Sequence, residues 1–328
     1  MKELAGTEKL GTLIKAFPQS LKILEDLGMK LSAADQKKSL VEIALVKKIP
    51  LQVILNNLSK KLGLQVKWPE IAGVGEHYKD DFSKSTGLRK GKPAGIGKIL
   101  AVHSGKGGVG KTTLAILIAS FLNKAGKKVG ILDLDIDCPN VMRALGMEER
   151  HVANKEKKIQ PLMVDGMKVV SMGAIQERPN QAIMWRGPVM AKAIEQLFMD
   201  SDWGELDVLV VDFPPGTSEA PLTFFNMIKP DGVLIITTPQ VTALDDAAKA
   251  VDMCKSLQVP IFGVLENMCG EIFGEANRER TEKTTGAKWL GAIDLDRKLA
   301  QEVFWREPIE EIRSKWLTDL EKIIFSKQ

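Results

Sequence analysis

The chain has 328 residues, of which 44% are hydrophobic and 27% charged, a composition typical of a globular protein with one large domain or two. No apolar run is long enough to span a membrane and the N-terminal residues carry several lysines, so we expect neither a transmembrane segment nor a secretory signal, and a cytoplasmic location. The three cysteines form no C-x-x-C pair, which excludes a disulfide framework and a self-contained four-thiolate metal site. A formal net charge of +4 is too small for a dedicated nucleic-acid-binding protein.

Charge and patterning separate a basic front part from a larger remainder. Residues 1–98 hold 18 Lys and Arg against 10 Asp and Glu, so their charge is +8 and that of the rest is −4. Apolar residues at helical spacing, with Pro18 and Pro50 in first turns, predict three or four short helices in residues 1–66, which we interpret as a docking module for a partner protein. Residues 67–97 are rich in Gly, Lys, Pro and Ser without periodicity and are predicted to be a linker. Without interleaved aromatic residues this linker is not expected to bind nucleic acid.

Residues 98–328 change to short apolar runs that alternate with helical stretches. Continuous apolar runs suit strands buried on both faces, and helical crossovers between them make the strands parallel. The sequence therefore predicts an α/β domain with a doubly wound, mainly parallel sheet, in which a ligand binds beyond the carboxyl ends of the strands. The predicted strands are 99–103, 129–132, 169–172, 208–211, 233–237, 261–265 and 289–293.

The strongest motif is Gly105-Lys-Gly-Gly-Val-Gly-Lys-Thr112, which matches the phosphate-binding pattern G-x-x-x-x-G-K-[ST]. It lies between a predicted strand and a predicted helix, where glycines let consecutive backbone N–H groups converge on phosphate oxygens and the helix N-terminus adds its dipole. We predict that Lys111 reaches the β- and γ-phosphates of ATP and that the Thr112 hydroxyl ligates Mg²⁺. The predicted nucleotide-binding residues of this loop are Gly105, Lys106, Gly107, Gly108, Val109, Gly110, Lys111, Thr112 and Thr113.

Acidic residues follow two of the predicted strands. Asp133, Asp135 and Asp137 alternate after the strand 129–132, so an extended chain would aim them to one side, towards the phosphates. The strand 208–211 ends in Asp212, an acid that can hold Mg²⁺ through water, and we predict Asp133 as an outer Mg²⁺ partner. In the loop after Asp212, a glycine at position 216 can swing its amide towards a γ-phosphate. The alternative for each of the three alternating aspartates is that it caps the following helix.

The second lysine of the loop, Lys106, makes the loop resemble those of the deviant Walker A ATPases, which include MinD, ParA, the nitrogenase iron protein and the Mrp/ApbC group. The resemblance implies that Lys106 crosses a dimer interface to the phosphates of the partner, so that a homodimer holds two ATP molecules. The alternative is an ordinary solvated lysine on a loop.

Further motifs, in this order, resemble the Mrp/ApbC family of iron-sulfur carrier ATPases over residues 96–305. They are Trp185-Arg-Gly-Pro188, Trp203-Gly-Glu-Leu-Asp207, Asp212-Phe-Pro-Pro-Gly-Thr217, Thr237-Thr-Pro-Gln240 and Glu266-Asn-Met268. The resemblance implies Mg²⁺-dependent ATP hydrolysis by a dimer, with Lys106 and Lys111 at the phosphates, Asp135 positioning the attacking water and Asn267 hydrogen-bonded to adenine. It also implies a bridging [4Fe-4S] cluster that is passed to apo iron-sulfur proteins or assembly partners.

The chain departs from that family at the cluster site. The cluster ligands of the family are a C-x-x-C shortly after the Glu-Asn-Met stretch, where this chain has Cys269-Gly-Glu-Ile-Phe-Gly274 with a single cysteine. A dimer would then supply two thiolates, and a [4Fe-4S] cluster takes four ligands. We interpret the site as degenerate, with Cys269 either a remaining cluster ligand or a packed residue, and we expect Cys138 and Cys254 to be packing residues.

Two alternatives from other classes stay open. A positioning or regulatory ATPase of the MinD/ParA kind needs no cluster, and the amphipathic helix predicted over 309–325 could then touch a membrane, although core packing is the commoner use of such a stripe. A reductase component needs a cluster to carry electrons, and the missing cysteines argue against it.

Overall fold

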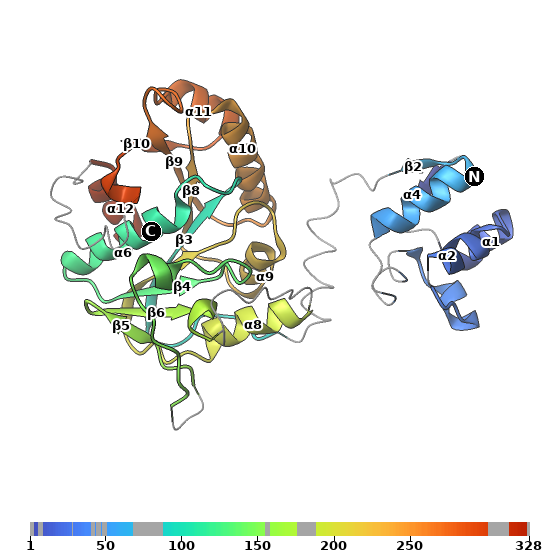
Figure 1. Ribbon diagram of the computed structural model, residues 1–328, viewed down its shortest axis with the longest axis horizontal. Helices are drawn as coiled ribbons and strands as arrows, with labels where there is room; N and C mark the ends of the chain where they lie inside the picture. Colours follow the sequence, from blue (N-terminus) through green and yellow to red (C-terminus); the bar gives the residue numbers. More distant parts are fainter. Residues whose placement is uncertain are drawn as a thin grey trace. The chain divides into compact units, whose positions relative to one another are not determined.

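The computed structural model divides the chain into two compact units, Met1–Tyr78 and Lys79–Gln328. Figure 1 shows both, coloured along the chain. The residues that the structure describes are 3–5, 9–27, 29–40, 43, 47, 51–67, 88–154, 158–175, 188–300 and 315–326.

The smaller unit is a set of short helices around its own apolar core. The helical segments are α1 (Leu10–Ala16), α2 (Ser20–Asp26), the 3₁₀ turn η1 (Ala33–Lys37) and α4 (Leu51–Leu62). They enclose the buried residues Leu10, Leu13, Ile23, Leu24, Leu40, Ile43, Ile54, Leu55 and Leu58. A short parallel pair that the sequence did not predict, β1 (Glu3–Ala5) with β2 (Gln65–Lys67), lies beside α4. Within its described residues this unit is therefore mainly helical, with one short strand pair added.

The larger unit is built on one sheet, which within the described residues has eight strands in the order β10-β9-β8-β3-β7-β4-β6-β5. The strands are β3 (Ile96–Ser104), β4 (Val129–Asp133), β5 (Leu162–Val164), β6 (Met167–Ser171), β7 (Leu206–Asp212), β8 (Gly232–Thr237), β9 (Ile261–Cys269) and β10 (Trp289–Asp294). Every pairing is parallel except that of β5 with β6. The predicted doubly wound, mainly parallel sheet is confirmed. The short edge strand β5 was missed because three residues carry too little periodicity to be recognised.

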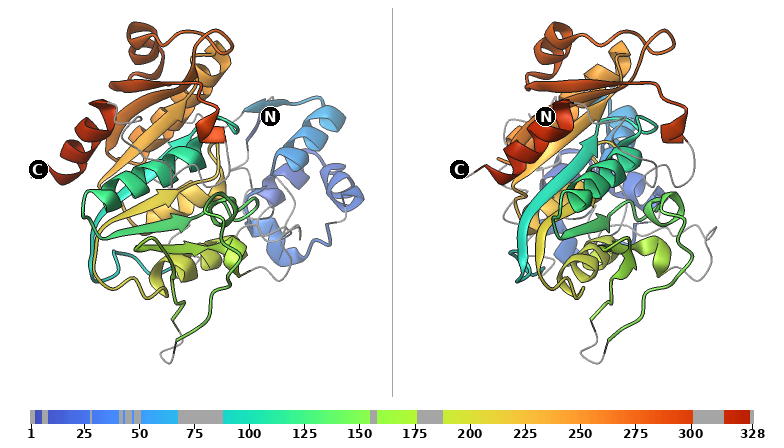
Figure 2. Two further views of the ribbon diagram at one scale, coloured as in Figure 1. Left: turned by 60° about the vertical axis from the view of Figure 1, so that its left-hand side comes forward. Right: turned by 90° about the vertical axis from the view of Figure 1, so that its left-hand side faces the viewer.

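Helices cover both faces of this sheet, as Figures 1 and 2 show. They are α6 (Lys111–Lys124), α7 (Val141–Ala144), η3 (Met172–Ala174), α8 (Pro188–Met199), α9 (Glu219–Met227), α10 (Val241–Ser256), α11 (Arg278–Thr285), η4 (Lys298–Ala300) and α12 (Lys315–Phe325). Helices α6 and α12 share one apolar core with one face of the sheet, and α8, α9 and α10 share a second core with the other face. The central strand β3 is consequently buried on both sides, and the loop after it begins at the middle of the sheet edge.

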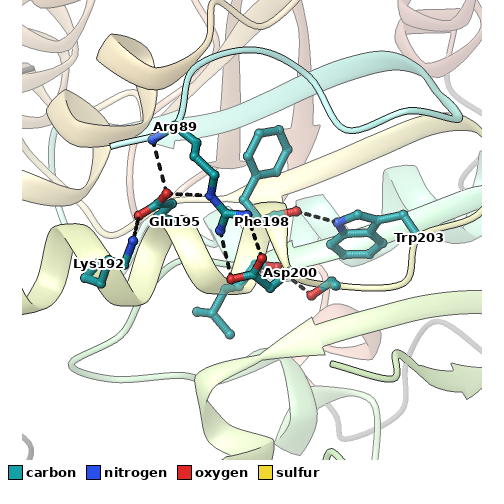
Figure 3. Close-up of polar contacts among 8 residues, drawn as sticks. Arg89, Lys192, Glu195, Phe198, Asp200 and Trp203 are labelled. Atoms are coloured by element: carbon teal, nitrogen blue, oxygen red, sulfur yellow. Dashed lines mark hydrogen bonds and ion pairs between the residues drawn. The ribbon is translucent and has the colours of Figure 1, made fainter. Parts of the chain in front are cut away.

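The last part of the predicted linker belongs to the larger unit. Strand β3 already begins at Ile96, and Leu88 packs against the core under α8 and α9. Figure 3 shows the reason: the Arg89 guanidinium bonds the Glu195 carboxylate through Nε at 2.6 Å and Asp200 through both terminal nitrogens at 2.7 and 2.8 Å. We name this group the Arg89 clamp. A composition rich in Gly and Lys suggests a linker, but a single arginine that pairs with buried Glu195 and is bidentate to the partly exposed Asp200 is enough to fix such a segment.

The C-terminal helix is a core element. Of the helix predicted over 309–325 the structure describes α12, and its apolar stripe packs on α6, β3 and β10. The buried residues of that stripe are Trp316, Leu317, Leu320 and Ile324. Across the described ranges, every helix is too short or too polar to cross a membrane.

Candidate functional site

The loop between β3 and α6 is shaped by glycines. Gly108 and Gly110 have φ angles of +79° and +87°, left-handed values that glycine adopts at little cost. A Cβ on Gly105 would overlap the backbone oxygen of Asp246 in α10, and one on Gly110 would overlap the side-chain amide of Asn267 at the end of β9. The absence of side chains therefore lets the loop lie directly against α10 and β9, with its backbone at the carboxyl edge of the sheet.

Both carboxylate oxygens of Asp212 face this loop. Lys111 Nζ lies 2.8 Å from Asp212 Oδ1, and Thr112 Oγ1 donates a hydrogen bond to Asp212 Oδ2 at 2.6 Å. The ion pair is deeply buried, since the side chains of Lys111 and Asp212 are 7% and 1% exposed. The fold thus brings together three residues from two separate motifs, because β7 lies beside β3 in the sheet and Asp212 ends it where α6 begins.

A second acid lies behind the first. Asp133 ends β4 in direct register with Asp212, and its carboxylate accepts hydrogen bonds from Ser171 Oγ at 2.9 Å and from the backbone N–H groups of Val141 and Asp135 at 3.3 and 3.1 Å. Burial, and next the neighbouring Asp212 carboxylate, raise the pKa of Asp133 to about 8. Two acids side by side in a buried position favour a cation beside them. The hydrogen bond from the Val141 N–H also connects Asp133 to the first residue of α7, whose N-cap residue is Asn140.

The three alternating aspartates do not line one side of an extended strand, because β4 ends at Asp133. Asp135 instead accepts a hydrogen bond from the backbone N–H of Cys138 at 3.2 Å, which closes a tight turn. Burial raises the pKa of the Asp135 carboxyl, while the charge of Lys111 opposes the shift. Asp135 is therefore within electrostatic range of Lys111, whereas Asp137 is exposed. The chain leaves extended geometry here because short polar side chains bond their own backbone in turns.

Asn267 joins the end of β9 to the phosphate-binding loop. Its Nδ2 donates a hydrogen bond to the Val109 carbonyl at 2.8 Å, and the residue is 5% exposed. The preceding residue, Glu266, is buried and accepts hydrogen bonds from the backbone N–H of Asn277 and from the Thr281 hydroxyl, which holds α11 near the loop. The amide that the resemblance assigns to adenine therefore lies beside the loop with one of its two N–H donors bonded to the Val109 carbonyl.

The cysteines lie in three different environments. Cys269 ends β9 and is 2% exposed, and burial, followed by the Glu266 charge, raises the pKa of its thiol to about 12. Cys254 is buried in α10, as the sequence predicts, and burial raises its thiol pKa to about 12. Cys138 is exposed, so the expectation that it packs locally is wrong; the turn closed by Asp135 carries it outwards. Among the described residues no group of three or more His, Cys, Asp or Glu side chains is arranged to hold a metal ion.

Sequence reasoning missed two polar residues of this region. Ser171 bonds Asp133, and His103 lies in β3 directly before the loop, fully buried. The available signal was a polar residue at the end of an otherwise apolar strand, which marks the functional edge of a parallel sheet. The motif Trp185-Arg-Gly-Pro188 lies outside the described residues except for its proline.

Comparison with known proteins agrees with this site. The family described as NUBPL iron-transfer P-loop NTPase, of the ParA type, matches residues 95–323. An iron-sulfur cluster carrier protein of Pyrococcus horikoshii is 43% identical over 220 residues, which are 61% of this chain and 74% of that protein. The human cytosolic Fe-S cluster assembly factor NUBP2 is 36% identical over 222 residues, 63% of this chain and 82% of that protein.

Among solved structures, a nucleotide-binding protein from Archaeoglobus fulgidus in complex with ADP superposes with a TM-score of 0.54 at 30% identity, covering 73% of this chain and 95% of that one. The loop, the acids behind it and the parallel sheet therefore occur in a chain whose relatives include iron-sulfur carriers and a nucleotide-bound protein. The resemblance drawn from the motifs is confirmed, and the chain belongs to the NUBPL iron-transfer family of P-loop NTPases.

Proposed function

We propose that this chain is a Mg²⁺-dependent ATPase that acts as a homodimer and delivers iron-sulfur clusters to apo-proteins in the cytosol, with a cluster site that it completes only with ligands from elsewhere. The observation that carries the proposal is the contact of Lys111 and Thr112 with the two oxygens of Asp212 at the end of a glycine loop. The names of the relatives, carriers and a cytosolic assembly factor, support the cargo and the location.

ATP binding exchanges partners around Lys111. The backbone N–H groups of the loop and the N-terminus of α6 bind phosphate oxygens, and Lys111 moves from Asp212 to the β- and γ-phosphates. The Thr112 hydroxyl and the Asp212 carboxylate, with Asp133 behind them, are hard oxygen donors of the kind that Mg²⁺ prefers, so these residues fit that ion. When bound there, Mg²⁺ supplies neutralisation of the phosphate charge.

Asp135 positions the attacking water. Its carboxylate is partly exposed and lies within the field of Lys111, and burial raises its pKa towards the range in which a carboxylate is a more effective base. The turn closed by the Cys138 N–H keeps the carboxylate directed to this position.

Exposed residues near the phosphate-binding loop support the proposed homodimer. Lys106 is exposed in the phosphate-binding loop, so its side chain is available to the phosphates of a nucleotide that a second subunit binds. Two exposed apolar side chains lie at the same edge of the sheet: Val241, which follows β8 and is 64% exposed, and Ile272, which follows β9 and is 74% exposed. Their burial against a second copy would place the two loops face to face.

The iron-sulfur cluster is the cargo, and this chain supplies only some of the ligands that bind it. The Cys269 thiol is protonated at neutral pH and buried, so ligation requires the segment after β9 to open and further ligands from a partner or a small thiol. We propose residues 1–66 as the docking module for such a partner. Support comes from the separate apolar core of the smaller unit and from the basic charge of the front part of the chain.

The first test measures iron and acid-labile sulfide per dimer after anaerobic reconstitution. The wild-type chain is compared with Cys269→Ser and with Cys254→Ser, a matched variant that removes another buried thiol. About four irons per dimer in the wild type and in Cys254→Ser, lost in Cys269→Ser, support cluster carriage through Cys269. No iron in the wild type, together with ATP-dependent dimerisation, favours instead a regulatory ATPase without a cluster.

The second test measures phosphate release with Mg²⁺ and with the ion removed by a chelator. The proposal expects turnover that requires Mg²⁺ and that Lys111→Ala abolishes. Turnover that persists in Lys111→Ala contradicts the assignment of the loop.

A further inference from the structure

His103 has a buried ring without hydrogen bonds. It is the penultimate residue of β3, separated from the phosphate-binding loop by Ser104 alone, and it is 0% exposed. Among the described residues, neither of its ring nitrogens has a hydrogen-bond partner. A neutral imidazole carries one N–H donor and one acceptor, and leaving either unpaired in the interior is unfavourable. The unpaired ring beside the phosphate-binding loop therefore needs an explanation, and a role in the function of that loop is one.

The surroundings of the ring belong to the loop that follows Asp212. The ring stands edge-to-face against Phe213, with centroids 5.9 Å apart and planes at 84°. The two strand neighbours of His103 accept backbone hydrogen bonds from this loop: the Val102 carbonyl from Phe213 at 3.2 Å and the Ser104 carbonyl from Gly216 at 2.8 Å. The loop is thus attached to β3 on both sides of His103.

The ring stays neutral in this position. Burial, and next the charge of Lys111, lower the pKa of His103 to about 3. The backbone of Pro214 and Gly216 lies beside the ring and opposes this lowering of the pKa, but in the present arrangement its geometry falls short of a hydrogen bond. The neutral ring keeps one N–H donor, and among the described residues that donor has no hydrogen-bond partner in the present arrangement.

We propose that His103 is a positioning residue for the loop Phe213–Ser218: its ring N–H bonds the loop backbone once the Gly216 N–H has left the Ser104 carbonyl for the terminal phosphate of the nucleotide. The proposal rests on the proposed ATP binding. In the present arrangement Gly216 is bonded and His103 is not, and in the second arrangement both are bonded. A group that is paired in only one of two states shifts the population towards that state. His103 thereby lowers the free energy needed to move the loop, and it does so only for a nucleotide whose terminal phosphate can hold Gly216.

The test compares affinities for ADP and for a non-hydrolysable ATP analogue, both with Mg²⁺. His103→Phe keeps an aromatic ring against Phe213 but removes both nitrogens. The ratio of its affinity for the analogue to its affinity for ADP is expected to be about five- to tenfold lower than the wild-type ratio. This is the change that one net hydrogen bond produces. His103→Gln restores a donor and is expected to recover part of the preference. Without nucleotide, the thermal midpoint of His103→Phe is expected to be no lower than that of the wild type, because no unpaired nitrogen remains.

A control separates positioning from core packing. Ile235 is the register partner of His103 across β3 and β8 and is fully buried, so Ile235→Val lowers the thermal midpoint through lost packing while leaving the ratio of the two affinities unchanged. An unchanged ratio in His103→Phe overturns the role of His103. A wild-type chain that binds neither nucleotide overturns the proposed function itself, so the two failures are distinguishable.

Discussion

The backbone N–H of Gly216 donates a hydrogen bond to the carbonyl of Ser104, with 2.8 Å between nitrogen and oxygen. Ser104 ends β3, and Gly216 lies in the loop after Asp212, so the loop expected to respond to a terminal phosphate is attached to the strand that leads into the phosphate-binding loop. Lys111 is similarly paired with Asp212. Gly216 and Lys111, which would both contact a nucleotide, are thus bonded to other protein groups in this structure, and nucleotide binding requires both to exchange partners.

The close approach of the phosphate-binding loop to α10 predicts a strong effect of Gly105→Ala. The added Cβ would overlap the backbone of Asp246, which α10 holds in place, and overpacking of this kind costs about 1–3 kcal/mol. We expect a lower thermal midpoint and weaker nucleotide binding. Gly107→Ala is the matched control: its Cβ would meet Pro215 Cγ at 3.7 Å, an ordinary contact, so its stability should stay within about 0.5 kcal/mol of the wild type. Equal destabilisation by both substitutions would contradict the packing argument.

The Arg89 clamp predicts a specific acid dependence of stability (Figure 3). Burial alone would raise the pKa of Glu195, but its bonds with Lys192 and Arg89 outweigh burial and bring the pKa from 4.5 down to about 2. Because the folded state binds the proton more weakly than the unfolded state, the contribution is complete above the unfolded pKa and is lost as the pH falls from 4.5 towards 2.

The measurement for the clamp is urea denaturation as a function of pH. At neutral pH, Glu195→Gln should lower the free energy of unfolding by about 1–3 kcal/mol, because a charged hydrogen bond to Arg89 is weakened. The difference from the wild type should shrink below about pH 4. A difference that stays constant down to pH 2 would show that the Glu195 charge is not responsible.

Lys106 should act across the dimer. In Lys106→Ala the loop amides and Lys111 remain, so nucleotide affinity should stay within about threefold of the wild type, while turnover should fall by about a thousandfold, as for other cationic groups supplied in trans. Mixing Lys106→Ala with Lys111→Ala provides the control. A mixed dimer has one site with an intact Lys111 that receives Lys106 from the other subunit, so activity should reappear on mixing. If neither variant rescues the other, Lys106 does not act in trans.

Alkylation should distinguish the three thiols. With iodoacetamide at pH 8, exposed Cys138 should react first, and Cys269 and Cys254 at least about a hundredfold more slowly, because both are buried and their thiol pKa values lie near 12. Mass spectrometry of tryptic peptides measures each rate, with denatured protein as the reference for full reactivity. Selective acceleration at Cys269 on adding ATP would show that the segment after β9 opens. Rapid labelling of Cys269 in the nucleotide-free chain would contradict its burial.

Local pattern accounts for what the sequence could predict. The strands of the parallel sheet are continuous apolar runs, and the loop at Gly105 is a contiguous motif, so both are readable without knowing any distant contact. What was missed depends on distant or side-chain-specific contacts. Arg89 and Glu195 are 106 positions apart, and the sequence around Arg89 does not indicate which acidic residue it pairs with. The turn at Asp135 likewise reflects competition between a carboxylate and the strand for backbone N–H groups, which alternation alone does not reveal.

The strand order of the sheet also determines when the chain can assemble during synthesis. Strand β3 is the first strand of the larger unit to be made, yet its neighbours are β7 and β8, and Leu100 pairs with Val210 on one side and Gly232 on the other. More than a hundred residues must therefore leave the ribosome before this strand can pair with either neighbour, whereas the helices of the smaller unit contact one another over shorter separations along the chain. The apolar residues of β3 consequently stay without their strand partners during that interval, which is when an incomplete larger unit is most exposed to aggregation.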